Sequence, residues 1–252
     1  MGTHSLMLYD GLEVAELARR LAAPHCLCLT TVTSTLDIIH ELAAEGAPAG
    51  TVVLADEQVA GRGRQGRRWY SPPGAGIWLG YLQRPQRPPE GGVSALRVGL
   101  AVVTAVSELG ADGRLKWPND IVVRDRKLGG VLCEARWAGG QPSWIAVGIG
   151  VNVHGPLSEE QVEGAIALDE VVSSATRIVV LEQLVPRLHA LSDEPELTDE
   201  ECLAFSRYDW LSGKQLRDPV VGLARGIGAD GSLLVETGEG LERIVGGTIV
   251  TA

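Results

Sequence analysis

Helical and strand-like spacings of apolar residues alternate through most of the chain. Apolar positions three and four residues apart predict amphipathic helices at 12–21, 34–44, 92–109, 178–191 and 198–206. Runs of β-branched and other apolar residues predict strands at 25–29, 51–55 and 77–82. Ser34 or Thr35 is suited to cap the second helix, because a hydroxyl accepts from the free N–H groups of a first turn. The mixture predicts an α+β fold in which helices cover a sheet.

A β-meander is predicted after the helix at 92–109. Its strands are expected at 114–117, 121–123, 128–134 and 144–153, separated by short turns. Consecutive strands joined by short turns pair antiparallel. This segment is therefore expected to add antiparallel strands to the sheet.

The pattern of apolar and polar residues changes at about Tyr208. Short strands are predicted at 220–224, 232–236 and 247–251, with glycine-containing turns at 229–231 and 238–240. Several short strands within some forty residues predict a small appended barrel. We therefore divide the chain into a helical segment at 1–23, a main domain at 24–206 and a small C-terminal domain at 207–252.

Composition bounds the class of protein. The 252 residues are 45% hydrophobic and 21% charged, which is enough to bury a full core. No apolar run approaches the ~20 residues of a membrane span, and the first residues lack the pattern of an export signal. The net charge of -10 argues against a broad nucleic-acid-binding surface, which needs a wide basic face. We expect a cytoplasmic protein with no membrane or nucleic-acid partner.

Cysteine and histidine usage argues against metal or triad chemistry. The four cysteines and five histidines show neither metal-ligand pairing nor the spacing of a disulfide framework. Cys26 and Cys28 alternate on a predicted strand, so both are expected on one face as small core residues. We predict no metal ligands in the chain, and no Ser-His-Asp triad.

Residues 61–68, called here the arginine loop, concentrate positive charge in an acidic protein. Arg62, Arg64, Arg67 and Arg68 are spaced by glycines between two predicted strands. Glycines let a backbone fold down on a ligand, and guanidinium groups donate in pairs to phosphate or carboxylate. No Gly-Lys-Ser/Thr follows, so the loop is not a P-loop. The loop predicts an anion site; a flexible solvated loop is the alternative.

Two further segments carry candidate binding residues. Lys127 follows a predicted turn and precedes Gly129 and Gly130, where a ligand can approach the backbone closely. The alternative for Lys127, as for Lys116, is a solvated surface lysine. Asn152 ends an apolar strand interrupted by glycines, and its amide suits an adenine edge. A hydrogen-bonded core asparagine is the alternative there.

Four segments together resemble the biotin protein ligases. They are 61–69 (GRGRQGRRW), 116–120 (KWPND), 127–132 (KLGGVL) and 148–152 (GIGVN), in the order and approximate spacing of that family. The resemblance extends from about residue 26 to the end of the chain. It implies an SH2-like mixed sheet with helices, related to the class II aminoacyl-tRNA synthetases, followed by an SH3-like barrel.

The resemblance also implies roles for individual residues. Ser34, Thr35 and Gln58 match positions that hold biotin, although Leu36 stands where the family usually has asparagine. Arg62, Arg64 and Arg67 resemble the catalytic arginines that close over biotin and the adenylate phosphate, and Lys127 resembles the lysine that contacts both. Trp69 and Asn152 resemble adenine-pocket residues, while Lys116, Asn119 and Asp120 match the ATP and magnesium side. The remaining ligand-site positions implied by the resemblance are Gly61, Gly129, Gly130, Leu132 and Gly150.

The implied reaction forms biotinoyl-AMP from biotin and ATP with Mg²⁺, then transfers biotin to a lysine of a biotin carboxyl carrier protein. We expect the arginine loop to be disordered without ligand and to close over the adenylate. A lipoate or acyl ligase of the same superfamily is the closest alternative. A non-catalytic sensor of biotinoyl-AMP is another, but it requires DNA binding, for which the 23 residues before the main domain offer little room.

Two points stay open in the sequence. Homodimers are common in the family, but no residue pattern decides the oligomeric state of this chain. In the C-terminal domain, Lys214 and Arg225 could approach the nucleotide, with solvated barrel residues as the alternative.

Overall fold

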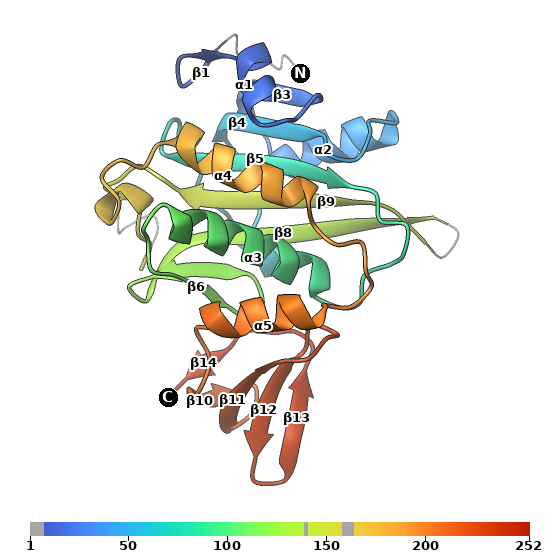
Figure 1. The fold of residues 1–252 in the computed structure, drawn as a ribbon, viewed down its shortest axis with the longest axis vertical. Coiled ribbons are helices and arrows are strands. Elements are labelled where there is room, and N and C mark those ends of the chain that lie inside the picture. The colour runs from blue at the N-terminus through green and yellow to red at the C-terminus, as the bar shows by residue number, and fades with distance from the viewer. Residues whose placement is uncertain (1–7, 139–140, 158–163) are drawn as a thin grey trace.

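The main body of the protein is a seven-stranded mixed sheet with helices on both faces. The computed structural model describes residues 8–138, 141–157 and 164–252. The strand order is β3-β4-β5-β9-β8-β7-β6, in which β3 and β4 are parallel and all other neighbours antiparallel (Figure 1). The strands are β3 (Cys26–Val32), β4 (Val52–Gln58), β5 (Gly76–Gln83), β6 (Gly113–Lys116), β7 (Asp120–Val123), β8 (Arg126–Ala138) and β9 (Gln141–Asn152). The predicted α+β class and the antiparallel meander are confirmed.

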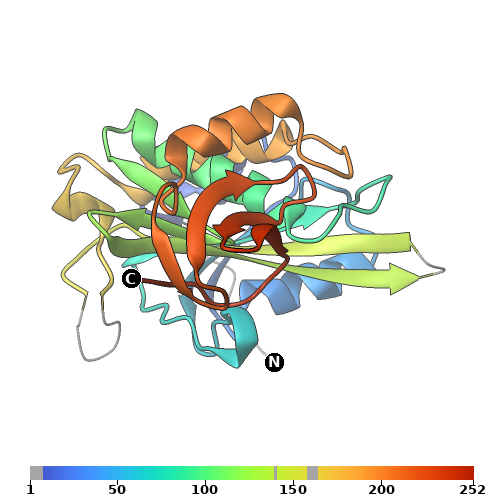
Figure 2. The same ribbon diagram turned by 90° about the horizontal axis from the view of Figure 1, so that it is seen from below.

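The helices divide between the two faces of this sheet. Figure 2 shows α2 (Thr35–Ala44) on one side and α3 (Val93–Glu108) with α4 (Arg177–His189) on the other. The fifth helix, α5 (Asp199–Tyr208), packs against α3 between the main sheet and the C-terminal strands (Figure 1). A short helix, α1 (Val14–Arg20), lies against β3. None of the described helices is long and apolar enough to cross a membrane.

Burial explains why β4 and β5 read as apolar runs instead of alternating patterns. Both strands are central and covered on both faces, so residues of each parity enter a core. One apolar cluster lies between the sheet and the α3 side, and the other lies under α2. Each fully buried aliphatic side chain contributes about 1.5–3 kcal/mol. The sheet is therefore a rigid platform for whatever its edges and turns carry.

One glycine sets how closely α2 approaches this platform. A Cβ built on Gly80 of β5 would lie 2.7 Å from Ile39 Cγ1 and 2.9 Å from the carbonyl oxygen of Thr35. The absence of a side chain at Gly80 thus lets the first turn of α2 sit directly on the strand. Ser34 caps that turn by accepting from the N–H of Leu36 at 3.4 Å, which confirms the predicted cap. The start of α2 is thereby fixed beside the end of β4.

The C-terminal strands form a five-stranded antiparallel sheet. Its order is β13-β12-β11-β10-β14, and Figure 1 shows it below α5. The strands are β10 (Gln215–Asp218), β11 (Gly222–Ile227), β12 (Leu233–Thr237), β13 (Gly240–Ile244) and β14 (Val250–Thr251). The predicted C-terminal β domain is confirmed, but the sequence missed β10 and β13. Most residues of these two strands are exposed and polar, so they lack the apolar alternation that marks a strand.

The N-terminal helix begins later than expected. Residues Leu8–Tyr9 (β1) and Leu12–Glu13 (β2) form a two-stranded hairpin, and α1 starts only at Val14. Arg177 of α4, which is 5% exposed, joins the hairpin through Asp10 and the main sheet through Asp56. A buried guanidinium that is paired on both sides ties the hairpin to the sheet.

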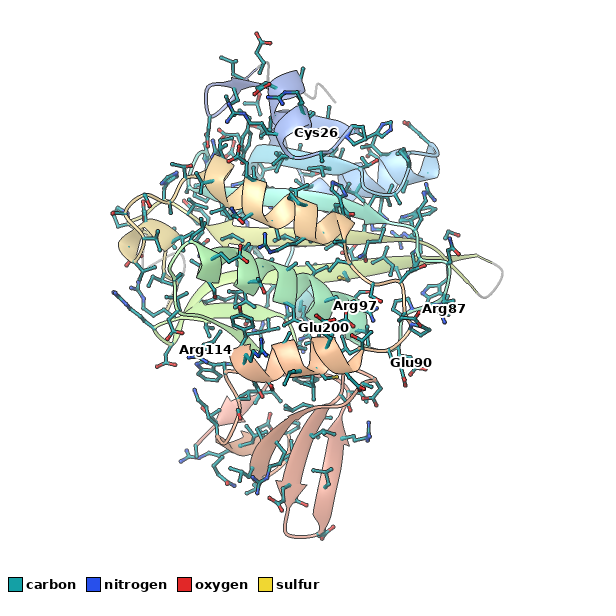
Figure 3. The ribbon with its side chains drawn as sticks, viewed as in Figure 1. Cys26, Arg87, Glu90, Arg97, Arg114 and Glu200 are labelled. Atoms are coloured by element: carbon teal, nitrogen blue, oxygen red, sulfur yellow. The ribbon has the colours of Figure 1, made fainter. Side chains whose placement is uncertain are left out.

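A second buried arginine joins three segments around α3. Arg97 is 4% exposed and donates to both carboxylate oxygens of Glu201 on α5, at 2.7 and 3.0 Å. It also donates to the backbone carbonyls of Glu194 and Glu196 before that helix. Figure 3 shows Arg97 on α3 beside the start of α5. The small sheet is joined nearby, where Trp117 Nε1 donates to the carbonyl of Gly231 at 2.9 Å.

We predict that Arg97→Ala lowers the free energy of unfolding by about 3 kcal/mol, because it leaves Glu201 and two carbonyls without their buried donor. Urea unfolding followed by circular dichroism measures this loss. Arg87→Ala is the matched control, since Arg87 forms an exposed ion pair with Glu194, and it should cost less than about 1 kcal/mol. Equal losses in the two variants would contradict a buried anchoring role for Arg97.

Candidate active site

One cavity of about 300 Å³ opens where the separate motifs of the chain meet. Its walls come from the start of α2, the arginine loop, the turn between β6 and β7, and facing parts of β8 and β9. A short segment before β14, residues 247–249, closes one side. Segments as far apart in the chain as Ser34 and Ile249 thus share one site.

The structure brings nearly all the predicted site residues to this cavity. Those that line it are Ser34, Thr35, Gln58, Arg62, Arg64, Arg67, Trp69, Lys116, Asn119, Asp120, Lys127, Gly130, Leu132, Gly150 and Asn152. Leu36, at the position where the resemblance expects asparagine, also lines the wall and packs near Gly148.

Gly61 and Gly129 do not line the cavity. A Cβ on Gly61 would lie 2.5 Å from the carbonyl oxygen of Trp69, and one on Gly129 would lie 2.7 Å from that of Gly150. Both glycines permit close backbone approach within the wall instead of contact with its inner surface.

The sequence missed the contribution of the C-terminal segment. Gly247, Thr248 and Ile249 line the cavity, whereas the two C-terminal residues considered from the sequence do not. Arg225 pairs with Glu236 on the small sheet, and Lys214 lies over the ring of Trp210 with its ammonium 3.1 Å from the centroid. Residues 247–249 carry no charge and no aromatic ring. Only their position in space assigns them to the site.

The Trp69 indole packs against the backbone of two glycines. Gly130 of β8 and Gly150 of β9 are direct partners in the sheet, and both face the indole. A Cβ on Gly150 would be 2.4 Å from Trp69 Cε2, so no other residue fits without moving the ring. The indole Nε1 is buried and, among the described residues, has no hydrogen-bond partner. A buried, unpaired donor is unusual in a native protein, and a ligand or an ordered water in the cavity is one explanation for it.

Lys127 projects between this indole and a carboxylate. Its Nζ lies 2.6 Å from Asp120 Oδ1 and 5.2 Å from the centroid of the Trp69 ring. Asp120 and Lys127 come from neighbouring antiparallel strands, so the pair is fixed by the sheet register. The ammonium thus stands in the cavity wall, neutralised by the Asp120 carboxylate, and the Lys127 side chain is 38% exposed. This geometry favours a ligand-facing lysine over the solvated alternative.

Two amide side chains are held in fixed orientations. Gln58 accepts from the backbone N–H of Thr35 at 2.9 Å and donates to Ser71 Oγ at 2.9 Å. Asn152 is 4% exposed and donates to the carbonyls of Lys127 and Ile166, at 3.4 and 3.3 Å. Asn152 is therefore the buried, hydrogen-bonded asparagine of the alternative considered from the sequence, and it also lines the cavity. Its binding of an adenine edge stays a prediction.

The arginine loop has a paired neck and a tight tip. In the neck, Arg62 and Arg68 form an antiparallel bridge, and Trp69 donates its N–H to the carbonyl of Gly61 at 2.8 Å. The tip, residues 64–67, begins with a single 3₁₀ turn, Arg64–Gly66, in which Gln65 and Gly66 adopt positive φ angles of 58° and 73°. Glycine adopts this left-handed region without steric cost.

The arginines of the loop have specific partners, unlike those of a flexible solvated loop. Arg64 reaches across to Asn119 Oδ1 at 3.1 Å, and Arg67 contacts Thr248 Oγ1 at 3.4 Å. Arg68 turns outward and donates to the carbonyl of Val59. In the structure the tip therefore touches two walls of the cavity. Disorder of this loop without ligand stays a prediction.

Arg62 differs from Arg64 and Arg67 in its charge environment. Its guanidinium forms two parallel hydrogen bonds with the Glu134 carboxylate, both 3.1 Å, and also donates to Asp37. Burial lowers the pKa of Arg62, but the hydrogen bond that Arg62 donates to Asp37 and the charges of both carboxylates raise it above its ordinary value overall. For Arg64 and Arg67, no ion pair is present among the residues that the structure describes.

The carboxylates near the cavity do not form a metal cage. Within 8–138, 141–157 and 164–252, no group of three or more His, Cys, Asp or Glu side chains is placed to hold a metal ion. Asp120 is the acidic side chain that lines the cavity, and it is paired with Lys127.

Comparison with known proteins identifies the family. The model of the biotin/lipoate A/B protein ligase family matches residues 27–152, and that of the biotin protein ligase C-terminal domain matches residues 214–251. The bifunctional ligase/repressor BirA of Escherichia coli is 34% identical, over 94% of this chain and 77% of that protein. The chain belongs to the biotin protein ligase family. The resemblance found in the sequence is thus confirmed.

Other biotin protein ligases agree in sequence and in fold. The biotin–[acetyl-CoA-carboxylase] ligase of Mycobacterium tuberculosis is 31% identical, over 82% of this chain and 81% of that protein. A biotin protein ligase mutant from Aquifex aeolicus, solved in complex with biotin, superposes with a TM-score of 0.76 at 27% identity. The superposed residues make up 90% of this chain and 98% of the Aquifex aeolicus chain. The Aquifex aeolicus ligase in complex with biotin and ATP superposes with a TM-score of 0.69 at 26% identity. The superposed residues make up 91% of this chain and 99% of that chain.

We predict that Gly150→Ala displaces the Trp69 indole, whereas Gly130→Ala does so far less, because a Cβ there would lie 3.4 Å from the ring. The Gly150 variant should lose about 1–3 kcal/mol of unfolding free energy through overpacking. The indole N–H signal of Trp69 in a ¹⁵N–¹H spectrum, assigned with Trp69→Phe, checks the displacement. An unmoved signal in Gly150→Ala would show that Gly130 and Gly150 do not determine the position of the ring.

Proposed function

We propose that this chain is an ATP-dependent biotin protein ligase. It forms biotinoyl-5′-AMP from biotin and ATP, then transfers biotin to a lysine of the biotin carboxyl carrier protein of acetyl-CoA carboxylase. The observation that carries the proposal is the convergence of Lys127, the arginine loop and Asn152 on one cavity. The relatives named for biotin ligation and the structures that hold biotin and ATP support the same activity.

The first step requires positive charge at the reacting centre. The biotin carboxylate attacks the α-phosphate of ATP, and two unit charges 4 Å apart repel by about 4 kcal/mol at an effective dielectric near 20. Lys127 and the guanidinium groups at the tip are placed to offset this repulsion. The mixed anhydride forms as the bond between the α-phosphorus and the bridging oxygen breaks, and pyrophosphate leaves.

The pairing of charges assigns different roles to the cations. Among the residues that the structure describes, Arg64 and Arg67 hydrogen-bond to uncharged side chains, Asn119 and Thr248 among them, so their positive charge remains available for the phosphate. Lys127 is paired with Asp120, and a substrate carboxylate or phosphate can replace that partner on its ammonium. Arg62 is already neutralised by two carboxylates, which favours an anchoring role over direct catalysis.

Magnesium fits as part of the nucleotide substrate. Mg²⁺ is commonly held by one or two carboxylates together with substrate phosphates. Asp120 offers one carboxylate at the cavity, and the residues described do not form a cage of their own. Mg²⁺ supplies charge neutralisation on the phosphates when it is bound with ATP.

The second step requires the carrier lysine to reach the enclosed anhydride. Its neutral amine attacks the biotinoyl carbonyl, AMP leaves, and an amide is formed. The tip of the arginine loop must therefore open or shift between the two steps. We retain the division into 1–23, 24–206 and 207–252, and a cytoplasmic location, as part of this proposal.

The test is incubation with radiolabelled biotin, ATP, Mg²⁺ and a biotin carboxyl carrier domain, with a parallel lipoate reaction on a lipoyl carrier domain. We expect label on the biotin carrier and none on the lipoyl carrier. The family that matches residues 27–152 includes lipoate ligases, so the comparison is decisive. Transfer of lipoate without biotin would overturn the proposal.

We predict that Arg64→Ala releases about tenfold more free biotinoyl-AMP per biotin transferred, since loss of one charge-assisted hydrogen bond of about 1.5–3 kcal/mol opens the tip. Thin-layer chromatography of the released adenylate measures this ratio. Arg225→Ala is the control, because it removes the same charge from the distant small sheet. An unchanged ratio in Arg64→Ala would show that the loop does not protect the anhydride.

A further inference from the structure

A chain of hydrogen bonds runs behind the arginine loop, outside the cavity. It begins at Trp144 on β9, passes through His40 on α2 and Glu134 on β8, and ends at Arg62. The indole Nε1 of Trp144 lies 2.9 Å from His40 Nδ1, and His40 Nε2 lies 2.9 Å from Glu134 Oε2. Of these four residues only Arg62 lines the cavity. The mechanism proposed above uses none of the other three.

The indole determines which way the histidine faces. A tryptophan N–H can only donate, so His40 Nδ1 must accept. Nε2 then carries the proton and donates it to the Glu134 carboxylate. His40 is largely buried, with 12% of its side chain exposed, and its ring is tilted against that of Trp144. The ring is therefore held in one orientation from both sides.

Glu134 is in turn positioned to receive Arg62. Its carboxylate accepts three hydrogen bonds, two from the guanidinium and one from His40. Asp37, the second carboxylate on Arg62, is itself held by the hydroxyl of Thr33 at 2.8 Å. Because Arg62 lies in the paired neck of the loop, these contacts join the neck to both α2 and β8.

We propose that His40, oriented by Trp144, is a positioning residue for the arginine loop. It fixes the Glu134 carboxylate so that Arg62 holds the neck over the cavity, and this sets the fraction of time the loop is closed. The effect on the adenylate rests on the function proposed above. The effect on the loop does not, because it concerns the protein without any substrate.

Two amide variants separate the two hydrogen bonds of His40. In His40→Gln the amide nitrogen can take the place of Nε2 and donate to Glu134. In His40→Asn the shorter amide can accept from Trp144 but does not reach Glu134. His40→Asn should therefore open the loop and His40→Gln should largely preserve it. Trp144→Phe, which keeps an aromatic ring but removes the donor, should give an intermediate result.

Limited trypsin digestion of the full chain, run in parallel without substrate and with saturating biotin and ATP, measures loop opening directly. The arm with substrate compares the variants even when the loop is disordered without ligand. Cleavage after Arg64 and Arg67, quantified by mass spectrometry, follows the population of the open loop when reclosing is fast. We expect about a five- to tenfold rise in His40→Asn, less than twofold in His40→Gln, and a value between them in Trp144→Phe. Cleavage after Arg124, in the exposed turn between β7 and β8, is the internal control and should not change.

The second readout is catalytic. In the biotin ligation assay, free biotinoyl-AMP per transferred biotin should rise in His40→Asn by about the same factor as loop cleavage, with the KM for ATP changed less than twofold. Equal loop cleavage in His40→Asn and His40→Gln would overturn the proposal, because a purely structural role would affect both. Increased cleavage without increased release would leave the positioning role standing and instead overturn the protective role of the loop.

Discussion

The site depends on the contact between the Trp69 indole and two glycines of the main sheet. Gly130 and Gly150 are partners on adjacent strands, so their missing side chains leave a flat strip of backbone on which the ring lies. This contact fixes the end of the arginine loop against the sheet and gives Lys127 an aromatic face beside its ammonium. It adds to the Arg62 ion pairs that hold the neck of the loop and to the Asp120 ion pair that holds Lys127.

The cations of the site differ in how they are neutralised. This difference distinguishes the cation that holds the loop in place from those that are available to the phosphate. Arg62 is held by two carboxylates and Lys127 by one, whereas Arg64 and Arg67 contact neutral groups. Separating the Arg62 guanidinium from its two carboxylates costs free energy, so Arg62 stabilises the base of the loop. Guanidinium groups with neutral partners lose little when a phosphate arrives. The protein thereby keeps a strongly cationic tip on a fixed neck while its net charge is -10.

The sequence predicted most of the fold because its central strands and helices have strong periodic patterns. It missed β10 and β13, whose exposed polar residues give no alternation, and the hairpin before α1, whose strands are two residues long. In the site, four short motifs and their resemblance to the biotin protein ligases supplied about half of the residues that line the cavity. Thr248 and the pairing of His40 with Trp144 could not be predicted, because they depend on which distant segments meet in space.

The contact between Thr248 and the tip of the loop couples the docking of the small C-terminal sheet to the free energy of ligand binding. The Thr248 hydroxyl lies 3.4 Å from Arg67 Nη2 and 3.5 Å from Gln65 Oε1, just before β14. Coupling between two equilibria is reciprocal, so a ligand that holds the tip closed also stabilises the docking of the small sheet, by the same factor. A change at Thr248 that weakens this contact can therefore alter ligand affinity without touching the ligand.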